Sequence, residues 1–167
     1  RALGHTPYAL ARVHGNRAMA DLLEARGAAP PLTDVEAQLA RAADDSPAPR
    51  DWIDMAALTP ELSRLLCRLV GREGALLHMR RLVAMGFDPN VADEMDLPPV
   101  HLAGWEGLPD VMRFFLDRRP DLSHVNGFGG SLLSTIMHGS ENCPQRATRD
   151  HIACARMALE HGVALPK

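Results

Sequence analysis

The chain has 167 residues, a net charge of −3 and an isoelectric point of about 6.2, so no basic excess points to nucleic acid or an anionic membrane. A hydrophobic fraction of 46% excludes a disordered chain, and an aromatic fraction of 4% indicates a core of Leu, Ala, Val and Met. No apolar run approaches the roughly 18–20 residues of a membrane-spanning helix.

The cysteine content favours a reducing compartment. Cys67, Cys143 and Cys154 are odd in number and form no CxxC pair, which suits a cytoplasmic protein better than a disulfide-bonded one. Abundant Ala, Arg, Pro and Gly are typical of a GC-rich bacterial source. The start at Arg1 favours a longer native chain, of which this is one part.

Short helices separated by turns are predicted along the whole chain. In chain order they span residues 6–15, 15–27, 33–43, 50–57, a segment opening at 59, 74–86, 98–107, 107–119, 128–139 and 151–162. Thr33 and Glu36 form a capping-box pattern, and Thr59 with Pro60 is a typical helix start. Helices of about ten residues do not persist alone in water, so each must be covered by neighbours.

These helices repeat as pairs. Three segments have the same length, with first and last residues twelve positions apart: 15–27, 74–86 and 107–119. Each carries an apolar stripe at helical spacing. A second short helix precedes each of them, which gives about five helix–turn–helix units stacked as a solenoid. Pro47 and Pro49 leave only 50–57 for one partner helix, so the second unit is degenerate or, alternatively, a mobile linker.

Two of these units resemble the ankyrin repeat. Thr6-Pro7-Tyr8-Ala9-Leu10-Ala11 and Pro98-Pro99-Val100-His101-Leu102-Ala103 are similar to the family signature T-P-L-H-x-A, and Gly86-Phe87-Asp88-Pro89-Asn90 is similar to its turn. Gly86 and Arg119 lie 33 residues apart, which is the ankyrin period. The arrangement looks like that of bacterial multi-repeat ankyrin proteins.

The resemblance implies an all-α ankyrin-repeat solenoid in one domain, residues 1–167. The expected repeats are 1–29, 30–58 (degenerate), 59–92, 93–125 and 126–167. The 43 residues from Arg119 to Gly162 exceed the period by about ten, so an insertion is expected between the helices of the last repeat, around 139–149.

The repeats depart from the family signature at its capping pair. In ankyrin repeats the signature Thr and His form hydrogen bonds around the turn. Ala9 replaces the His in the first repeat, and Pro98 replaces the Thr in the fourth. We still expect His101 to act in helix capping rather than as a base or metal ligand.

The resemblance also places a binding surface, since ankyrin loop tips and first helices line a concave groove. By position, this predicts partner contacts at Asp93, Glu94, Met95, Asp96, Trp105, Glu106, Val125, Asn126 and Phe128. The acidic loop 88–96 is either a solvated turn, the favoured interpretation, or a contact for a basic partner with salt-sensitive binding. Trp105 equally suits a groove or a core.

A metal site is the alternative chemistry. His138, Cys143, His151 and Cys154 form an N₂S₂ set that could hold zinc if the four converged. Their structural roles are favoured: a helix end for His138 and an apolar face for Cys154. No phosphate-binding loop or nucleophile motif is present, and the glycines of 127–130 indicate a tight turn.

The sequence therefore predicts a non-catalytic module that binds a protein partner. We expect a monomeric, cytoplasmic domain without cofactor, and no binding to nucleic acid or membrane. The alternatives are a metal-responsive domain with zinc in the last repeat, or a spacer within a larger chain.

Overall fold

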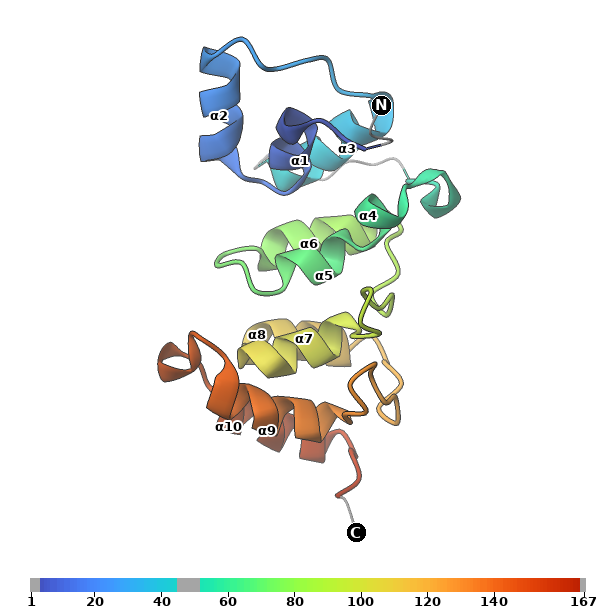
Figure 1. Cartoon of the computed structure of the whole chain (residues 1–167). Helices are drawn as coiled ribbons and strands as arrows, with labels where there is room; N and C mark the ends of the chain where they lie inside the picture. Colours follow the sequence, from blue (N-terminus) through green and yellow to red (C-terminus); the bar gives the residue numbers. More distant parts are fainter. Residues whose placement is uncertain (1–3, 45–51, 166–167) are drawn as a thin grey trace. The chain divides into compact units, whose positions relative to one another are not determined.

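The computed structural model describes residues 4–44 and 52–165, and all regular structure in these ranges is helical (Figure 1). The predicted all-α class is confirmed. The helices are α1 Pro7–Val13, α2 Arg17–Ala25, α3 Asp34–Ala43, α4 Pro60–Ser63, α5 Leu65–Leu69, α6 Leu76–Ala84, α7 Pro99–Glu106, α8 Pro109–Leu116, α9 Leu132–Asn142 and α10 His151–Glu160, with single 3₁₀ turns η1 Met55–Ala57 and η2 Arg146–Thr148.

The chain separates into two compact units. One comprises Arg1–Leu65 with Leu77–Phe87, and the other Leu66–Leu76 with Asp88–Lys167. Whether the chain acts as a single repeat domain remains an expectation from the sequence. No helix in the described ranges is long and apolar enough to cross a bilayer.

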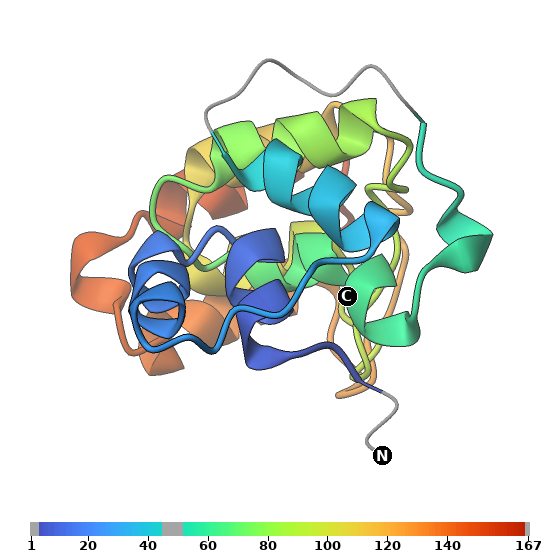
Figure 2. The same cartoon turned by 90° about the horizontal axis from the view of Figure 1, so that it is seen from above.

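In the first unit α1 packs beside α3 and against α2 (Figures 1 and 2). Tyr8, Ala11 and Ala20 are buried at the α1–α2 contact. Thr6 caps α1 by accepting a hydrogen bond from the Ala9 amide at 3.1 Å. The predicted capping box of α3 is confirmed: Thr33 Oγ1 accepts from Glu36 N, and Glu36 Oε2 accepts from Thr33 N.

The degenerate second repeat lacks the helix predicted over 50–57. Arg50, where that helix was expected to start, lies outside the described residues, as do Pro47 and Pro49. Only η1 is helical in the described remainder, because Trp52 and Ile53 instead lie along the end of α6. The Ile53 amide donates to the Met85 carbonyl at 2.9 Å. The helix predicted to open at Thr59 does so, but it is divided into α4 and α5.

The second unit contains two helical pairs, α7 with α8 and α9 with α10, and α9 packs along α7. Turns between and after helices take the left-handed conformation that the repeat pattern predicts. Gly107 caps α7 with a φ of 65°, and Arg119 adopts a φ of 52° at the position where glycine ends the other repeats.

Glycines allow α7 and α9 to approach closely. A Cβ built on Gly104 of α7 would lie 2.7 Å from Ile136 Cγ1 on α9. A Cβ on Gly139 of α9 would collide with the backbone of Trp105 on α7. Each helix therefore needs a residue without a side chain at its contact with the other.

This contact explains why the helix predicted over 128–139 extends beyond its expected C-terminal end; its start is at Leu132, after the Ser131 cap. Gly139 was expected to stop it, but α9 continues to Asn142 with Gly139 buried inside. The glycine serves packing rather than termination. The predicted insertion is present between α9 and α10, where residues 143–150 include η2.

We predict that Gly139→Ala destabilises the protein. Alanine in place of a helical glycine ordinarily stabilises by about 1 kcal/mol, but here the added methyl collides with the Trp105 backbone. Overpacking of this kind lowers the free energy of unfolding by about 1–3 kcal/mol. Chemical denaturation measures the change, and Ser140→Ala, one residue along the same helix, is the control. A stabilised Gly139→Ala variant would contradict the close α7–α9 packing.

Candidate functional site

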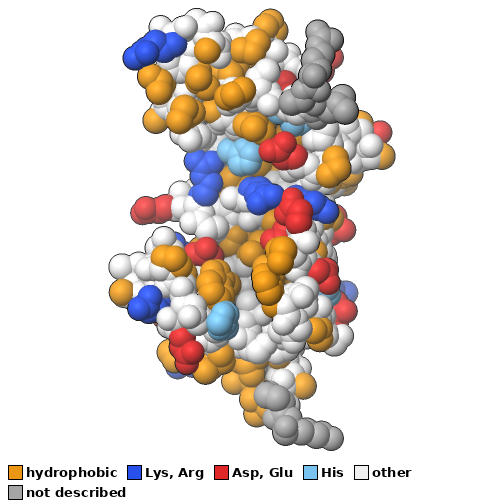
Figure 3. Space-filling model, in the orientation of Figure 1, with side chains coloured by type: hydrophobic (Ala, Val, Ile, Leu, Met, Phe, Trp, Pro, Cys, Tyr) orange, Lys and Arg blue, Asp and Glu red, His pale blue; other side chains and the backbone are white. Residues whose placement is uncertain are grey.

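An open groove of about 700 Å³ lies in the second unit along α7, α9 and the turn between 126 and 130. Its apolar side chains are Leu97, Leu102, Trp105 and Phe128. The remaining lining residues are Asn126, Gly129, Gly130, Ser134, Thr135 and His138. Apolar side chains and histidine are visible over α7 and α9 in Figure 3.

Trp105 belongs to this groove. Its ring is partly exposed and stacks at a tilt on His138 of α9, with ring centroids 5.2 Å apart. Asn142 Nδ2 donates to His138 Nδ1 at 3.1 Å, which leaves Nε2 of that imidazole as its N–H donor. The floor of the groove therefore offers an aromatic face beside a polar imidazole edge.

Phe128 stands at the tip of the next turn with 70% of its surface exposed. The turn itself is rigidly bonded, because Gly129 N donates to Asn126 O and Asn126 N donates to Gly130 O. Gly129 has a φ of 78°, so the prediction of a tight turn here is confirmed. A large apolar ring is thus held in solvent by an ordered backbone.

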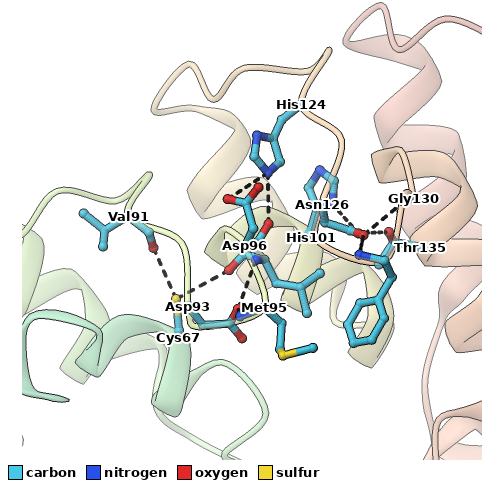
Figure 4. Close-up of polar contacts among 12 residues, drawn as sticks. Cys67, Val91, Asp93, Met95, Asp96, His101, His124, Asn126, Gly130 and Thr135 are labelled. Carbon is cyan, nitrogen blue, oxygen red and sulfur yellow. Dashed lines mark hydrogen bonds and ion pairs between the residues drawn. The ribbon is translucent and has the colours of Figure 1, made fainter. Parts of the chain in front are cut away.

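The loop of residues 93–96 is ordered by its own first residue. Asp93 Oδ1 accepts hydrogen bonds from the amides of Met95 and Leu97, at 2.8 and 3.0 Å (Figure 4). Gly127 N donates to the Met95 carbonyl at 2.9 Å and ties this loop to the Phe128 turn. Met95 is 47% exposed, so the two joined tips present Met95 and Phe128 together.

Two acidic side chains of this loop have side-chain partners of their own. Glu94 pairs with Arg68 at 2.7 Å, and Asp96 lies 3.5 Å from His124 Nε2. His124 Nε2 also contacts the Asp96 carbonyl oxygen at 2.9 Å. The exposed Glu94–Arg68 ion pair contributes little to stability, but it reduces the charge that Glu94 offers to a basic partner.

The structure places the predicted contact residues in three settings. Trp105, Asn126 and Phe128 line the groove, although Asn126 is only 5% exposed and its side chain is used internally. Asp93, Glu94, Met95, Asp96 and Val125 lie on the adjoining tips. Glu106 lies apart from the groove lining, with its carboxylate 3.7 Å from Arg149 Nη1 and accepting from Cys143 Sγ.

Seven lining residues were not predicted as groove residues from the sequence: Leu97, Leu102, Gly129, Gly130, Ser134, Thr135 and His138. Helical spacing carried the signal for some of them. Leu102 precedes Trp105 by three residues, and Thr135 precedes His138 by three, so each pair shares one face of its helix.

His101 lies at the centre of this region and is fully buried. Burial, reinforced by the neighbouring His124 and opposed by Asp96, lowers the pKa of His101 to about 4. The imidazole is therefore neutral near pH 7. The expected capping role is wrong, because the N-cap of α7 is Pro98, no side chain bonds the start of this helix, and the His101 ring contacts Asn126 instead.

Three residues of the alternative zinc set bond separate partners, and the fourth, Cys154, is buried as a thiol. His138 Nδ1 contacts Asn142, Cys143 Sγ donates to Glu106, and His151 Nε2 bonds the Trp105 carbonyl at 2.8 Å. Burial, with a smaller effect of Asp150, raises the pKa of Cys154 to about 12, so this thiol stays protonated. Among the described residues, no group of three or more His, Cys, Asp or Glu is arranged to hold a metal ion.

No model of a known protein family matches the chain. The chain is similar to the ankyrin repeat protein nuc-2 of Neurospora crassa, with 31% identity over 127 residues that cover 65% of this chain. The match spans 11% of the length of that relative. This similarity and the all-helical fold support the ankyrin-repeat resemblance; the relative is fungal, so a bacterial source stays an expectation.

We predict that Asp93 is needed to order its loop. Asp93→Ala removes the acceptor of two backbone amides and should lower the free energy of unfolding by about 1–2 kcal/mol. Asp93→Asn keeps an acceptor oxygen and should retain most of the stability. Glu94→Ala, which removes the exposed ion pair with Arg68 and leaves Asp93 in place, serves as the control and should change stability by less than about 0.5 kcal/mol. Equal effects of the Ala and Asn variants would contradict the bonding role.

We also predict that Cys154 resists alkylation in the folded protein. Its raised pKa leaves on the order of 1000-fold less thiolate than an ordinary cysteine has, and the side chain is fully buried. Iodoacetamide at pH 8, followed by mass spectrometry of the Cys154 peptide, should show little modification. The same reaction in guanidinium is the control and should modify all three cysteines. Rapid native labelling of Cys154 would contradict its burial.

Proposed function

We propose that the chain is a non-catalytic protein-interaction module that binds a protein partner in the groove along α7 and α9. The observation that carries this proposal is the concentration of exposed and half-exposed apolar side chains at one place. The chain has only seven Phe, Trp and Tyr residues, and two of them, Trp105 and Phe128, line this groove. Aromatic residues in such positions commonly dominate binding energy.

The geometry supports docking of an apolar side chain rather than of a charged one. Leu97, Leu102 and Trp105 provide the apolar surface, and Phe128 with Met95 stands on the rim. Because Glu94 is already paired with Arg68, a basic partner would gain little from that carboxylate. We therefore expect binding to depend weakly on salt and strongly on the aromatic side chains.

Rigidity also favours this function. The Phe128 turn and the 93–96 loop are held by hydrogen bonds before any partner arrives, so little conformational entropy is lost on docking. A monomeric, cytoplasmic module that requires no cofactor, nucleic acid or membrane fits the same proposal. If the chain were only a spacer, partner capture would not depend on the side chains of the groove.

The test is affinity capture with the wild-type chain and matched single variants. Phe128→Ala and Trp105→Ala should each weaken capture of the same partner by about 30-fold, as expected for loss of about 2 kcal/mol at a binding hot spot. Ile152→Ala is the control, because Ile152 is 71% exposed on α10 and lies outside the groove lining.

The melting temperature of each variant shows whether weaker capture comes from a lost contact or from a destabilised fold. Phe128→Ala removes a ring that is mostly in solvent, so the variant should melt close to the wild type. Partners captured equally by wild type, Phe128→Ala and Trp105→Ala would show that the groove is not the binding surface.

A further inference from the structure

The side chain of Asn126 is fully engaged at the base of the Phe128 turn. Its Oδ1 accepts hydrogen bonds from Phe128 N at 3.0 Å and Gly130 N at 3.1 Å. Its Nδ2 donates to Thr135 Oγ1 at 2.9 Å and lies 3.2 Å from His101 Nδ1. One amide therefore joins the turn, α9 and α7 (Figure 4).

These partners fix which way the Asn126 amide faces. Backbone amides can only donate, so the oxygen of Asn126 must face Phe128 and Gly130. The nitrogen, with both of its hydrogens, then faces Thr135 and His101. The Thr135 hydroxyl donates its own hydrogen to the Ser131 carbonyl at 2.8 Å, so its oxygen accepts the hydrogen bond from Asn126.

The same reasoning fixes the state of His101. Its Nδ1 receives a hydrogen from Asn126, so Nδ1 carries the lone pair and the ring proton is on Nε2. Adding a proton to Nδ1 would set an N–H against the N–H of Asn126. It would also place a charge on a fully buried ring whose Nε2 has no hydrogen-bond partner.

We propose that His101 is a proton-sensitive latch on the groove, which holds the Phe128 turn when neutral and releases it when protonated. In this proposal Asn126 is a positioning residue and not a partner contact. The conformational part stands whether or not a protein docks in the groove. Only its consequence, weaker docking in acid, rests on the proposed function.

The groups around His101 set the pH at which the latch opens. His124 is the nearest, with its ring edge-on at 5.4 Å between centroids, and its positive charge disfavours protonation of His101 while Asp96 favours it. Because the pKa of His101 is held near 4, the folded state prefers the neutral ring. The turn is therefore latched at neutral pH and is released as pH falls through about 4.

Other titratable groups on neighbouring elements act elsewhere. His138 of α9 and His151 of α10 meet α7 at Trp105, toward its C-terminal end. Asp93 of the preceding loop bonds the amides of Met95 and Leu97. Asp110 and Arg113 of α8 and Glu141 of α9 are exposed, Cys154 of α10 stays protonated, and Cys67 of α5 faces the Leu97 carbonyl.

Nitrogen-15 NMR of the histidine rings tests the latch directly and needs no partner. At pH 7 His101 should be in the Nε2–H form, and its titration midpoint should lie below 5. The amide signals of Phe128 and Gly130 should shift with that same midpoint, while core signals of Met112 and Ile136 remain native. An Nδ1–H form at pH 7, or loss of the core signals at the same midpoint, would overturn the proposal.

The variant Asn126→Asp should raise the pKa of His101, which the wild-type environment lowers. One carboxylate oxygen can still accept from Phe128 and Gly130, but the other now faces His101 as an acceptor. Protonation of His101 should become favourable, and its midpoint should rise by two pH units or more. An unchanged midpoint would contradict the direct contact.

His124→Gln is the matched control, because it removes the neighbouring imidazole without touching Asn126. The turn should still be released in acid, with the His101 midpoint moved upward. If the Phe128 and Gly130 signals no longer respond to pH in this variant, His124 and not His101 controls the turn. Since no partner is used, failure here leaves the proposed function untouched, and failed capture leaves the latch untouched.

Discussion

The contact between α7 and α9 is the constraint on which the groove depends. Gly104 and Gly139 let the two backbones come so close that a methyl group at either position would collide with the opposite helix. This closeness places Trp105 against His138 and brings Thr135 within reach of Asn126. A wider spacing would separate the groove floor from the turn that forms its wall.

Hydrogen bonds of buried polar groups determine the arrangement of turns and loops, which apolar packing alone does not determine. Apolar contacts are non-directional, whereas the amide of Asn126 accepts only one arrangement of the Phe128 turn. A similar link occurs in the first unit, where His5 contacts Glu36 of the α3 capping box and Thr59 at the start of α4. In each unit, histidine connects segments far apart in sequence, which short helices with few aromatic residues could not orient by packing alone.

Local structural features were predictable from the sequence where the residues that form them are neighbours along the chain. The Thr33–Glu36 capping box, the start at Thr59 and the tight turn at Gly129 all follow from side chains within a few positions. Gly139 was misread because a glycine that ends a helix and one that admits another backbone look alike in sequence. Only the Trp105 backbone, 34 positions earlier, distinguishes them.

The location of the groove was predictable from the sequence, but the role of each residue in it was predictable only in part. Family resemblance located Trp105, Asn126 and Phe128, yet it could not show that Asn126 is buried while Phe128 is exposed. The helix that carries His101 has Pro98 at its N-cap, where the family signature has threonine. Without a hydroxyl at the start of α7, the His101 ring has no capping partner in its own turn, and it bonds the asparagine of the next turn. A loss of capping within one repeat has thus become a link between repeats, and it is this link that makes the groove wall sensitive to a proton.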